Sequence, residues 1–209
     1  MLSLKAYDLA IEKFKNALEV NPDNVSACAG VATCYFNMDN MQRVKEEAEK
    51  GIKIDSKSEK PYIIRALAYY HSKEFDKALQ DLEKAIKLSP ENNLALYNYA
   101  YLLQEHNDRD KAIKTYQKII SRDKNSTLSI CAEGFIFLLR GEYERARKNA
   151  YRVIQKDQSF SDAYYILGKI AEKHGNKSQA MFEYKRALKI DPQHVEAREG
   201  MERVKSEKY

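Results

Sequence analysis

Histidine and cysteine are the residue types in this sequence that could support catalysis or metal binding. His71, His106 and His174 lie far apart in the chain, and none has a Cys, Asp or Ser partner at the spacing of a nucleophilic triad or a zinc site. Each lies near the end of a predicted helix, where an imidazolium ion interacts favourably with the helix dipole. We therefore interpret these three histidines as structural.

The cysteines show no pairing of the kind that metal or redox sites use. Cys28 and Cys34 lie six residues apart on one predicted helix, which points them to different faces, and Cys131 is distant from both. Reduced thiols are expected, in keeping with a cytoplasmic location. The sequence also contains no Gly-rich phosphate-binding loop. We therefore expect no enzymatic activity, no metal site and no cofactor.

A basic stretch is the next candidate for chemistry. Residues 108–157 hold twelve Lys/Arg against seven Asp/Glu, in a chain whose net charge is +5. Arg145, Lys148, Arg152 and Lys156 recur every three or four residues, so they form one stripe on a predicted helix. The stripe is either a solvated face or a docking patch for an acidic partner. Nucleic acid is a weaker alternative, because few aromatic residues are interleaved with the basic ones.

The elements that position these residues follow from a regular repeat. The sequence positions of Ala10, Ala78, Ala112, Ala146 and Ala180 differ by 34 or by twice 34. A fixed period of this length predicts a solenoid, in which each unit buries its apolar face against its neighbours. The chain has only seven Gly and four Pro, so we expect it to be folded. It has no apolar run as long as a membrane span, so we expect no transmembrane helix.

Residues 59–92 show one unit most clearly. Two runs of apolar residues at helical spacing flank a polar turn predicted at Lys73–Asp76, and Pro90 ends the unit. Gly134 and Gly168 take the position that Ala66 holds here, which favours close approach of two helices over a loose hinge. The apolar positions are Tyr62, Ala66 and Tyr69 on the first helix and Ala78, Leu82 and Ala85 on the second.

The unit resembles the tetratricopeptide repeat, which implies an all-α fold, a right-handed α-solenoid of tandem helix-turn-helix repeats. The resemblance covers essentially the whole chain as a single domain, 1–209. The residues that carry it most completely are Tyr164, Leu167-Gly168, Ala180, Tyr184, Ala187 and Pro192. The expected parts are the second half of a repeat at 1–24, full repeats at 25–58, 59–92, 93–126, 127–160 and 161–194, and a capping helix at 195–209.

The N-terminal half-repeat leaves an apolar face, Ala10, Phe14 and Ala17, without its first helix. An unpaired apolar face indicates either a missing segment or an interaction site. We expect the chain to be part of a longer protein, with self-association through this face as the alternative.

The resemblance implies that the first helices line a concave groove used for ligands. Leu67, Tyr101 and Phe135 recur with the period of the repeat and are expected to stack as an apolar ladder, with internal packing of these side chains as the alternative. The groove is expected to bind a partner peptide or helix through hydrophobic anchors. The full set of candidate residues is Ile63, Leu67, Tyr70, Leu94, Tyr97, Asn98, Tyr101, Leu128, Phe135, Tyr165 and Lys169.

Some relatives hold a C-terminal carboxylate with a clamp of Lys, Asn and Arg side chains. Asn98 matches one clamp position, but Ile63, Leu67 and Leu128 stand where polar or basic donors belong. An unpaired, desolvated carboxylate is costly, so this function is disfavoured. The sequence therefore predicts a scaffold or adaptor that binds a partner protein, or alternatively the regulatory or targeting region of a larger enzyme or complex subunit.

Overall fold

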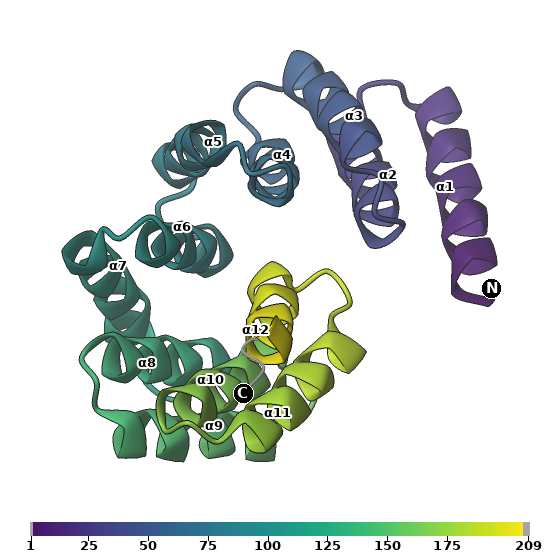
Figure 1. The fold of residues 1–209 in the computed structure, drawn as a ribbon. Helices are drawn as coiled ribbons and strands as arrows, with labels where there is room; N and C mark the ends of the chain where they lie inside the picture. Colours follow the sequence, from purple (N-terminus) through teal and green to yellow (C-terminus); the bar gives the residue numbers. More distant parts are fainter. Residues whose placement is uncertain (1, 207–209) are drawn as a thin grey trace. The chain divides into compact units, whose positions relative to one another are not determined.

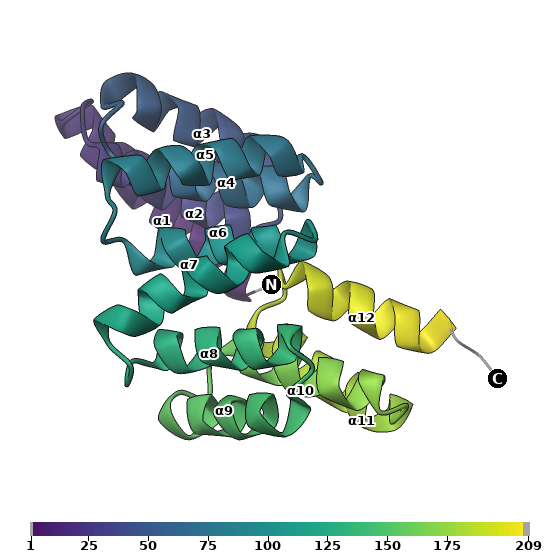
Figure 2. The same cartoon turned by 90° about the vertical axis from the view of Figure 1, so that its left-hand side faces the viewer.

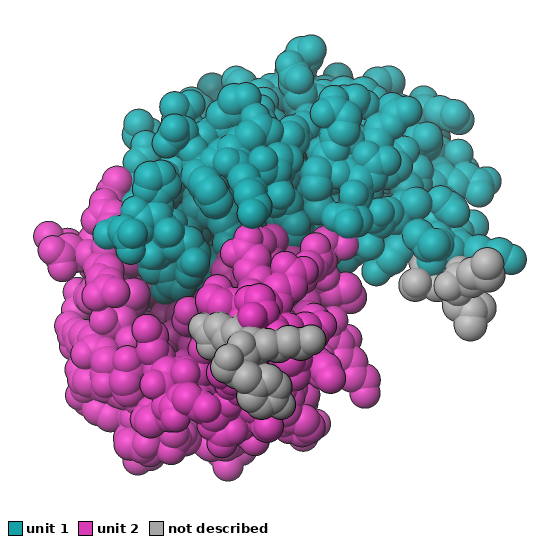
Figure 3. Space-filling view, viewed as in Figure 1, with its two compact units in different colours: residues 1–107 teal, residues 108–209 magenta. Residues whose placement is uncertain are grey.

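The computed structural model describes residues 2–206, and within that range the chain forms twelve α-helices and no strands. Within each of the two units described below, consecutive helices pair in antiparallel fashion through short turns, and the fold is the predicted all-α solenoid. Contacts divide the chain into two compact units, residues 1–107 and residues 108–209 (Figure 3). Each unit is described by itself.

Unit 1 contains the first six helices, each packed chiefly on its neighbours in the chain (Figure 1). Helix α2 also packs on α4, so that first helices of successive repeats lie against each other. The helices are α1 Leu2–Val20, α2 Val25–Asn37, α3 Met41–Ile54, α4 Lys60–His71, α5 Phe75–Leu88 and α6 Asn93–Glu105.

Unit 2 contains the other six helices and is organised around α10. This helix packs on α9 and α11 and also reaches α8 and α12 (Figure 2). The helices are α7 Arg109–Arg122, α8 Thr127–Leu139, α9 Tyr143–Lys156, α10 Ser161–Lys173, α11 Lys177–Ile190 and α12 Val195–Ser206.

Side-chain caps define where many of these helices begin. Before first helices, Asn24 Oδ1 accepts from the Ala27 N–H at 3.0 Å, and Asn92 Oδ1 accepts from the Ala95 N–H at the same distance. Such a bond satisfies one of the N–H groups that the first turn leaves without a helical partner. The same three-residue offset recurs at Asn40, Asp108, Ser126 and Asn176.

The turns inside the repeats share one backbone conformation. A single residue with positive φ stands between the first and second helix of each repeat, in step with the sequence period: Asp39, Lys73, Asn107, Gly141 and Gly175. The polar turn predicted at Lys73–Asp76 is therefore shorter than expected, because α5 already begins at Phe75. Asp and Asn tolerate the left-handed region and Gly adopts it freely, whereas Lys73 at φ 59° is strained.

Replacing Lys73 by Gly is expected to raise the free energy of unfolding by about 0.5–1 kcal/mol, because glycine has no Cβ to clash in this conformation. Urea unfolding of the Lys73→Gly chain measures the change. Gly141→Ala, at the equivalent turn, should have the opposite sign. Equal stability of the Lys73→Gly and original chains would contradict the strain.

The alanines that recur every 34 residues lie in the core. Ala78, Ala112, Ala146 and Ala180 have no exposed surface, and their small side chains bring the two helices of a repeat together. Larger side chains fill the spaces between repeats, above all Tyr116 and Tyr184.

The α1 face that was expected to be unpaired is occupied. Ala10 and Phe14 pack with Ile11 against Val31 and Cys34 of α2, and the Phe14 ring lies where a Cβ at Gly30 would be. Two of the three residues of the predicted self-association face therefore pack within the chain, because this second helix packs on the first helix of the following repeat. The exposed apolar side chains near this end are instead Leu4, Leu9 and Val20.

Candidate functional site

The predicted groove residues of unit 1 differ in how much surface they present. Leu94 is 55% exposed, and Leu67, Tyr70 and Asn98 are half-buried. Ile63, Tyr97 and Tyr101 are buried. Ile63, for example, packs with Tyr62, Ala85 and Ala95, so its side chain belongs to the core of the repeat stack and offers no surface to a partner.

The predicted residues of unit 2 divide in the same way. Leu128 and Lys169 are half-buried, whereas Phe135 and Tyr165 are buried. The Phe135 ring stacks on Tyr116 with centroids 5.7 Å apart and lies 6.3 Å from Tyr165, so aromatic neighbours on both sides exclude it from the surface. Of the expected ladder, only Leu67 presents surface, because Phe135 and Tyr101 are core residues.

A continuous row of rings lies along the turns of unit 1. The Phe36 ring is 4.8 Å from His71, His71 is 6.2 Å from Tyr70, Tyr70 is 5.7 Å from Phe75, and Phe75 is 6.2 Å from His106. We call these five residues the aromatic strip. Four of them are half-buried and His106 is exposed, so the rings of the strip pack partly within the protein and remain partly accessible to a partner.

The strip suits contacts with another polypeptide. Tilted and edge-on ring contacts hold aromatic side chains in place, and rigid aromatic groups bind partners at a low cost in conformational entropy. A shallow pocket of about 260 Å³ lies next to the strip, lined by Phe75, Glu105, His106 and Asn107. The strip thus combines apolar surface with imidazole groups that can donate or accept hydrogen bonds.

Sequence reasoning identified Tyr70 but missed the strip as a unit. A usable signal exists, because the pair Phe75 and His106 recurs two repeats later as Tyr143 and His174. The second pair also makes an edge-on contact, with centroids 5.3 Å apart. An aromatic residue at the start of a second helix and a histidine at the end of the next first helix are therefore a repeated contact.

A buried polar cluster lies in unit 2 at the start of α12. His194 occupies the capping position that Asn24 and Asn92 hold in other repeats, and its Nδ1 accepts from the Ala197 N–H at 3.4 Å. Nε2 of His194 lies 3.0 Å from Asp162 Oδ1, and Nδ1 lies 3.1 Å from Glu196 Oε2. Burial raises the pKa of Glu196 to about 8. Sequence reasoning missed this cluster because it did not include capping positions among the candidate sites.

The basic residues predicted as an acidic-partner patch, Arg145, Lys148, Arg152 and Lys156, are all exposed on α9. Arg145 donates to Glu142 and its guanidinium lies 4.0 Å from the Phe137 ring, while Arg152 donates to Asn149 Oδ1 at 3.1 Å. These neighbours hold two of the four cations against the helix surface.

His71, His106 and His174 lie at the ends of three different helices, apart from the buried cluster of His194, Asp162 and Glu196. His71 ends α4, His106 and His174 follow α6 and α10, and His174 Nδ1 lies 2.7 Å from the Ile170 carbonyl oxygen. The three cysteines are buried without a disulfide, and burial raises the pKa of the Cys28 and Cys34 thiols. Among residues 2–206, no group of three His, Cys, Asp or Glu side chains is placed to hold a metal ion. No helix in this range is long and apolar enough to cross a membrane.

Solved structures with the same fold are numerous. YrrB, a tetratricopeptide repeat protein with a peptide-binding site, aligns with a TM-score of 0.56 and 21% identity over 92% of this chain and 100% of its own. PilF of Pseudomonas aeruginosa aligns with a TM-score of 0.61 and 18% identity over 99% and 98% of the two chains. For the APC/C complex Cut9–Hcn1 the TM-score is 0.72 at 13% identity, over 96% of this chain but only 40% of that one.

A search of curated proteins by sequence found no match. Models of the tetratricopeptide repeat match residues 1–67 and 69–128, and a second such model matches residues 161–194. The matched segments cover well over half of the chain. The chain belongs to the tetratricopeptide repeat family.

Proposed function

We propose that this chain is a non-enzymatic protein–protein interaction scaffold that binds a partner peptide or helix along the aromatic strip of unit 1. Tetratricopeptide repeats imply protein partners, and the strip supports this particular surface. Its rings are packed well enough to be rigid, yet they remain partly accessible. Leu67, which packs on the same buried cluster as Phe36, and the exposed Leu94 provide further apolar surface on the first helices.

The buried members of the predicted groove support the same surface indirectly. Ile63 of α4 and Tyr97 and Tyr101 of α6 are buried in the stack, and Ile63 packs in one cluster with Ala95 of α6. A preorganised surface loses less entropy when it binds, which favours recognition by a few aromatic anchors.

Replacing Tyr70 and His71 by Ala is expected to lower affinity for the cellular partner at least about tenfold, since central aromatic contacts often contribute about 2 kcal/mol or more. Affinity capture with the intact chain, followed by quantitative mass spectrometry, identifies the partner and measures its loss from the variant. Far-UV circular dichroism should remain that of a helical protein.

The matched control is Leu138→Ala with Leu139→Ala, which truncates the half-buried side chains at the same two positions two repeats later, in unit 2. This control should retain the partner. Retention of the same partner by the Tyr70/His71 variant, at undiminished yield, would contradict the strip as the binding surface.

An alternative function is supported by α1, where Leu4, Leu9 and Val20 are 48%, 53% and 88% exposed. Apolar side chains of this size on one helix favour burial against another polypeptide. In this alternative, the chain is the regulatory or targeting region of a larger enzyme or complex. A third bait, Leu9→Ser, separates the two functions, because it should lose the partner only if α1 is the contact.

A further inference from the structure

The second helices of unit 2 carry an excess of positive charge, and α7, with five Lys/Arg and one Asp/Glu, shares it with α9 and α11. Helix α9 contains five Lys/Arg and one Asp/Glu, and α11 contains four and one. The second helix α5 of unit 1 is balanced, with three of each. Helix α10, on which both α9 and α11 pack, is also balanced, with two of each. The excess is therefore a property of the second helices of unit 2, and α9 and α11 present it on either side of α10.

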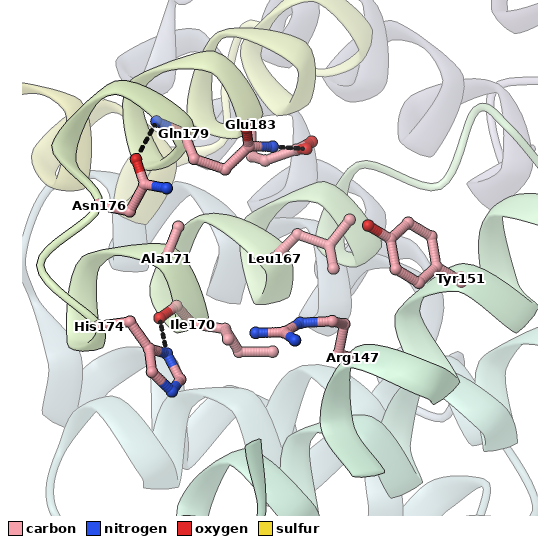
Figure 4. A pocket seen from close by; sticks show the side chains of 9 residues that line it. All are labelled: Arg147, Tyr151, Leu167, Ile170, Ala171, His174, Asn176, Gln179 and Glu183. Atoms are coloured by element: carbon pink, nitrogen blue, oxygen red, sulfur yellow. Dashed lines mark hydrogen bonds between the residues drawn. The ribbon is translucent and has the colours of Figure 1, made fainter. Parts of the chain in front are cut away.

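A pocket of about 430 Å³ lies between these two helices, above α10 (Figure 4). Leu167, Ile170 and Ala171 of α10 form an apolar floor. The Arg147 side chain extends from α9 over this floor, and Gln179 and Glu183 lie on the α11 side, where the Glu183 carboxylate accepts hydrogen bonds from Gln179 and Arg186 (Figure 4). The pocket thus offers methylene contacts beneath a guanidinium group, which fits a side chain that is apolar along its length and anionic at its tip.

The Arg147 guanidinium can exchange its present ion-pair partner, Glu144, for a carboxylate of a bound peptide. Its Nη1 donates to Glu144 Oε1 at 2.8 Å, but the two side chains are 39% and 76% exposed. Exposed ion pairs of this kind contribute little because solvent screens them. A carboxylate held within the pocket would meet the same guanidinium with less solvent around it, and so with a stronger attraction.

Exposed aromatic side chains lie on the same two helices. Tyr151 of α9, which lines the pocket, is 50% exposed, and Phe182 of α11 is 55% exposed. Both can cover apolar residues that flank an acidic one. Glu144 and the buried Glu183 interrupt the positive charge, which disfavours a continuous phosphate backbone or an anionic membrane and favours discrete carboxylates on a peptide.

We propose that the face formed by α9 and α11 is a second docking surface, which binds an acidic peptide segment of a partner protein with a Glu side chain in the pocket beside Arg147. Lys148 and Lys156 of α9 and Lys185 of α11, all exposed, provide the surrounding positive charge. This surface belongs to unit 2 alone and does not depend on the aromatic strip of unit 1.

Fluorescence anisotropy with a fluorescein-labelled, Glu-rich dodecapeptide containing one leucine tests the proposal. The intact chain should bind this peptide at least about tenfold more tightly than the same peptide with every Glu replaced by Gln. Lys148→Glu with Lys156→Glu should weaken binding about tenfold, and Arg147→Ala about fivefold. Higher salt should weaken binding further.

Lys84→Glu with Lys87→Glu on α5 is the matched control, because it changes the net charge by the same amount at exposed sites of unit 1. Its affinity should stay within about twofold of the original. An equal loss of peptide affinity in the two double variants would overturn the proposal, because it would show that the peptide responds to the net charge of the chain and not to the α9/α11 face. Tighter binding of oligouridylate RNA or of phosphatidylserine vesicles than of the peptide would overturn it as well, by assigning the face to another class of partner.

Discussion

Replacing Gly168 by Ala is expected to lower the free energy of unfolding of unit 2 by about 2 kcal/mol, even though alanine is the better helix former. A Cβ at this position would stand 2.5 Å and 2.6 Å from two ring carbons of Tyr184. Overpacking of a full core costs about 1–3 kcal/mol, and this cost exceeds the gain of about 1 kcal/mol in helix propensity.

The ring of Tyr184 cannot move aside to accept the methyl group. On its other side stands Gly200 of α12, where a Cβ would be 2.7 Å from the same ring. The Tyr184 hydroxyl donates to Glu172, which in turn accepts from Arg203 at 2.6 Å and 3.1 Å. Two glycines and a fixed hydroxyl thus confine the ring, and its side chain has no exposed surface.

The control is Gly134→Ala, which changes the same position one repeat earlier. There the nearest atom to the Cβ would be the terminal Cδ1 of Ile166 at 3.2 Å, a side-chain end that can shift, and the next, Asn149 Cβ at 3.6 Å, would be an ordinary contact. Stability should be unchanged or rise by up to about 1 kcal/mol. Urea unfolding followed by circular dichroism, with amide exchange of α10 as a local probe, measures both variants. Equal effects of the two substitutions would contradict confinement of Tyr184.

Gly134 and Gly168 show how much of the fold can be predicted from the 34-residue period of the sequence, here called the repeat register. It correctly places Gly134 and Gly168 at a close helix approach, and the first helices begin at Val25, Lys60 and Asn93, in step with the repeat. The register does not reveal which large side chain faces each glycine. That depends on the residue of the opposing helix, which is Tyr184 in one repeat and the flexible end of Ile166 in the other.

The candidate site was harder to predict for a related reason. The offset within a first helix gives the direction of a side chain, but burial depends on the size of its neighbours in adjacent repeats. Phe135 is buried because Tyr116 and Tyr165 are large, whereas Leu94 remains exposed. Contacts between the ends of helices, such as Phe75 with His106, link residues of two different repeats, and offsets within a single helix do not reveal them.

The stability of unit 2 is expected to fall as the pH rises toward 8, and replacing Glu196 by Gln should remove this loss. Burial raises the pKa of Glu196 from 4.5 to about 8, so the carboxyl group is protonated in the folded protein at neutral pH. In the unfolded chain it ionises near its ordinary pKa. The folded state therefore binds more protons between these two values, and by linkage its stability decreases with increasing pH across that interval.

The geometry around His194 also predicts that the protonated form of Glu196 is the one that stabilises the folded state. The Ala197 N–H donates to Nδ1 of His194 at the long distance of 3.4 Å, so the one lone pair of Nδ1 can be shared with a donor on Glu196 Oε2, which lies 3.1 Å away. A protonated Glu196 can donate to this lone pair, whereas an ionised one would face it with a second lone pair and would have the nearby Glu199 as a like charge. The amide of Gln can donate in the same place without titrating.

Glu196→Gln should therefore match the original chain near pH 4.5 and exceed it above pH 8, by an amount on the order of 3 kcal/mol. Urea unfolding from pH 4.5 to pH 9 measures the difference, which should grow continuously across the interval. Glu202→Gln, an exposed position on α12, is the control and should show no such growth. A Glu196→Gln chain that becomes the less stable of the two at pH 9 would show that the ionised carboxylate stabilises the fold, and the protonated state of this cluster would then be wrong.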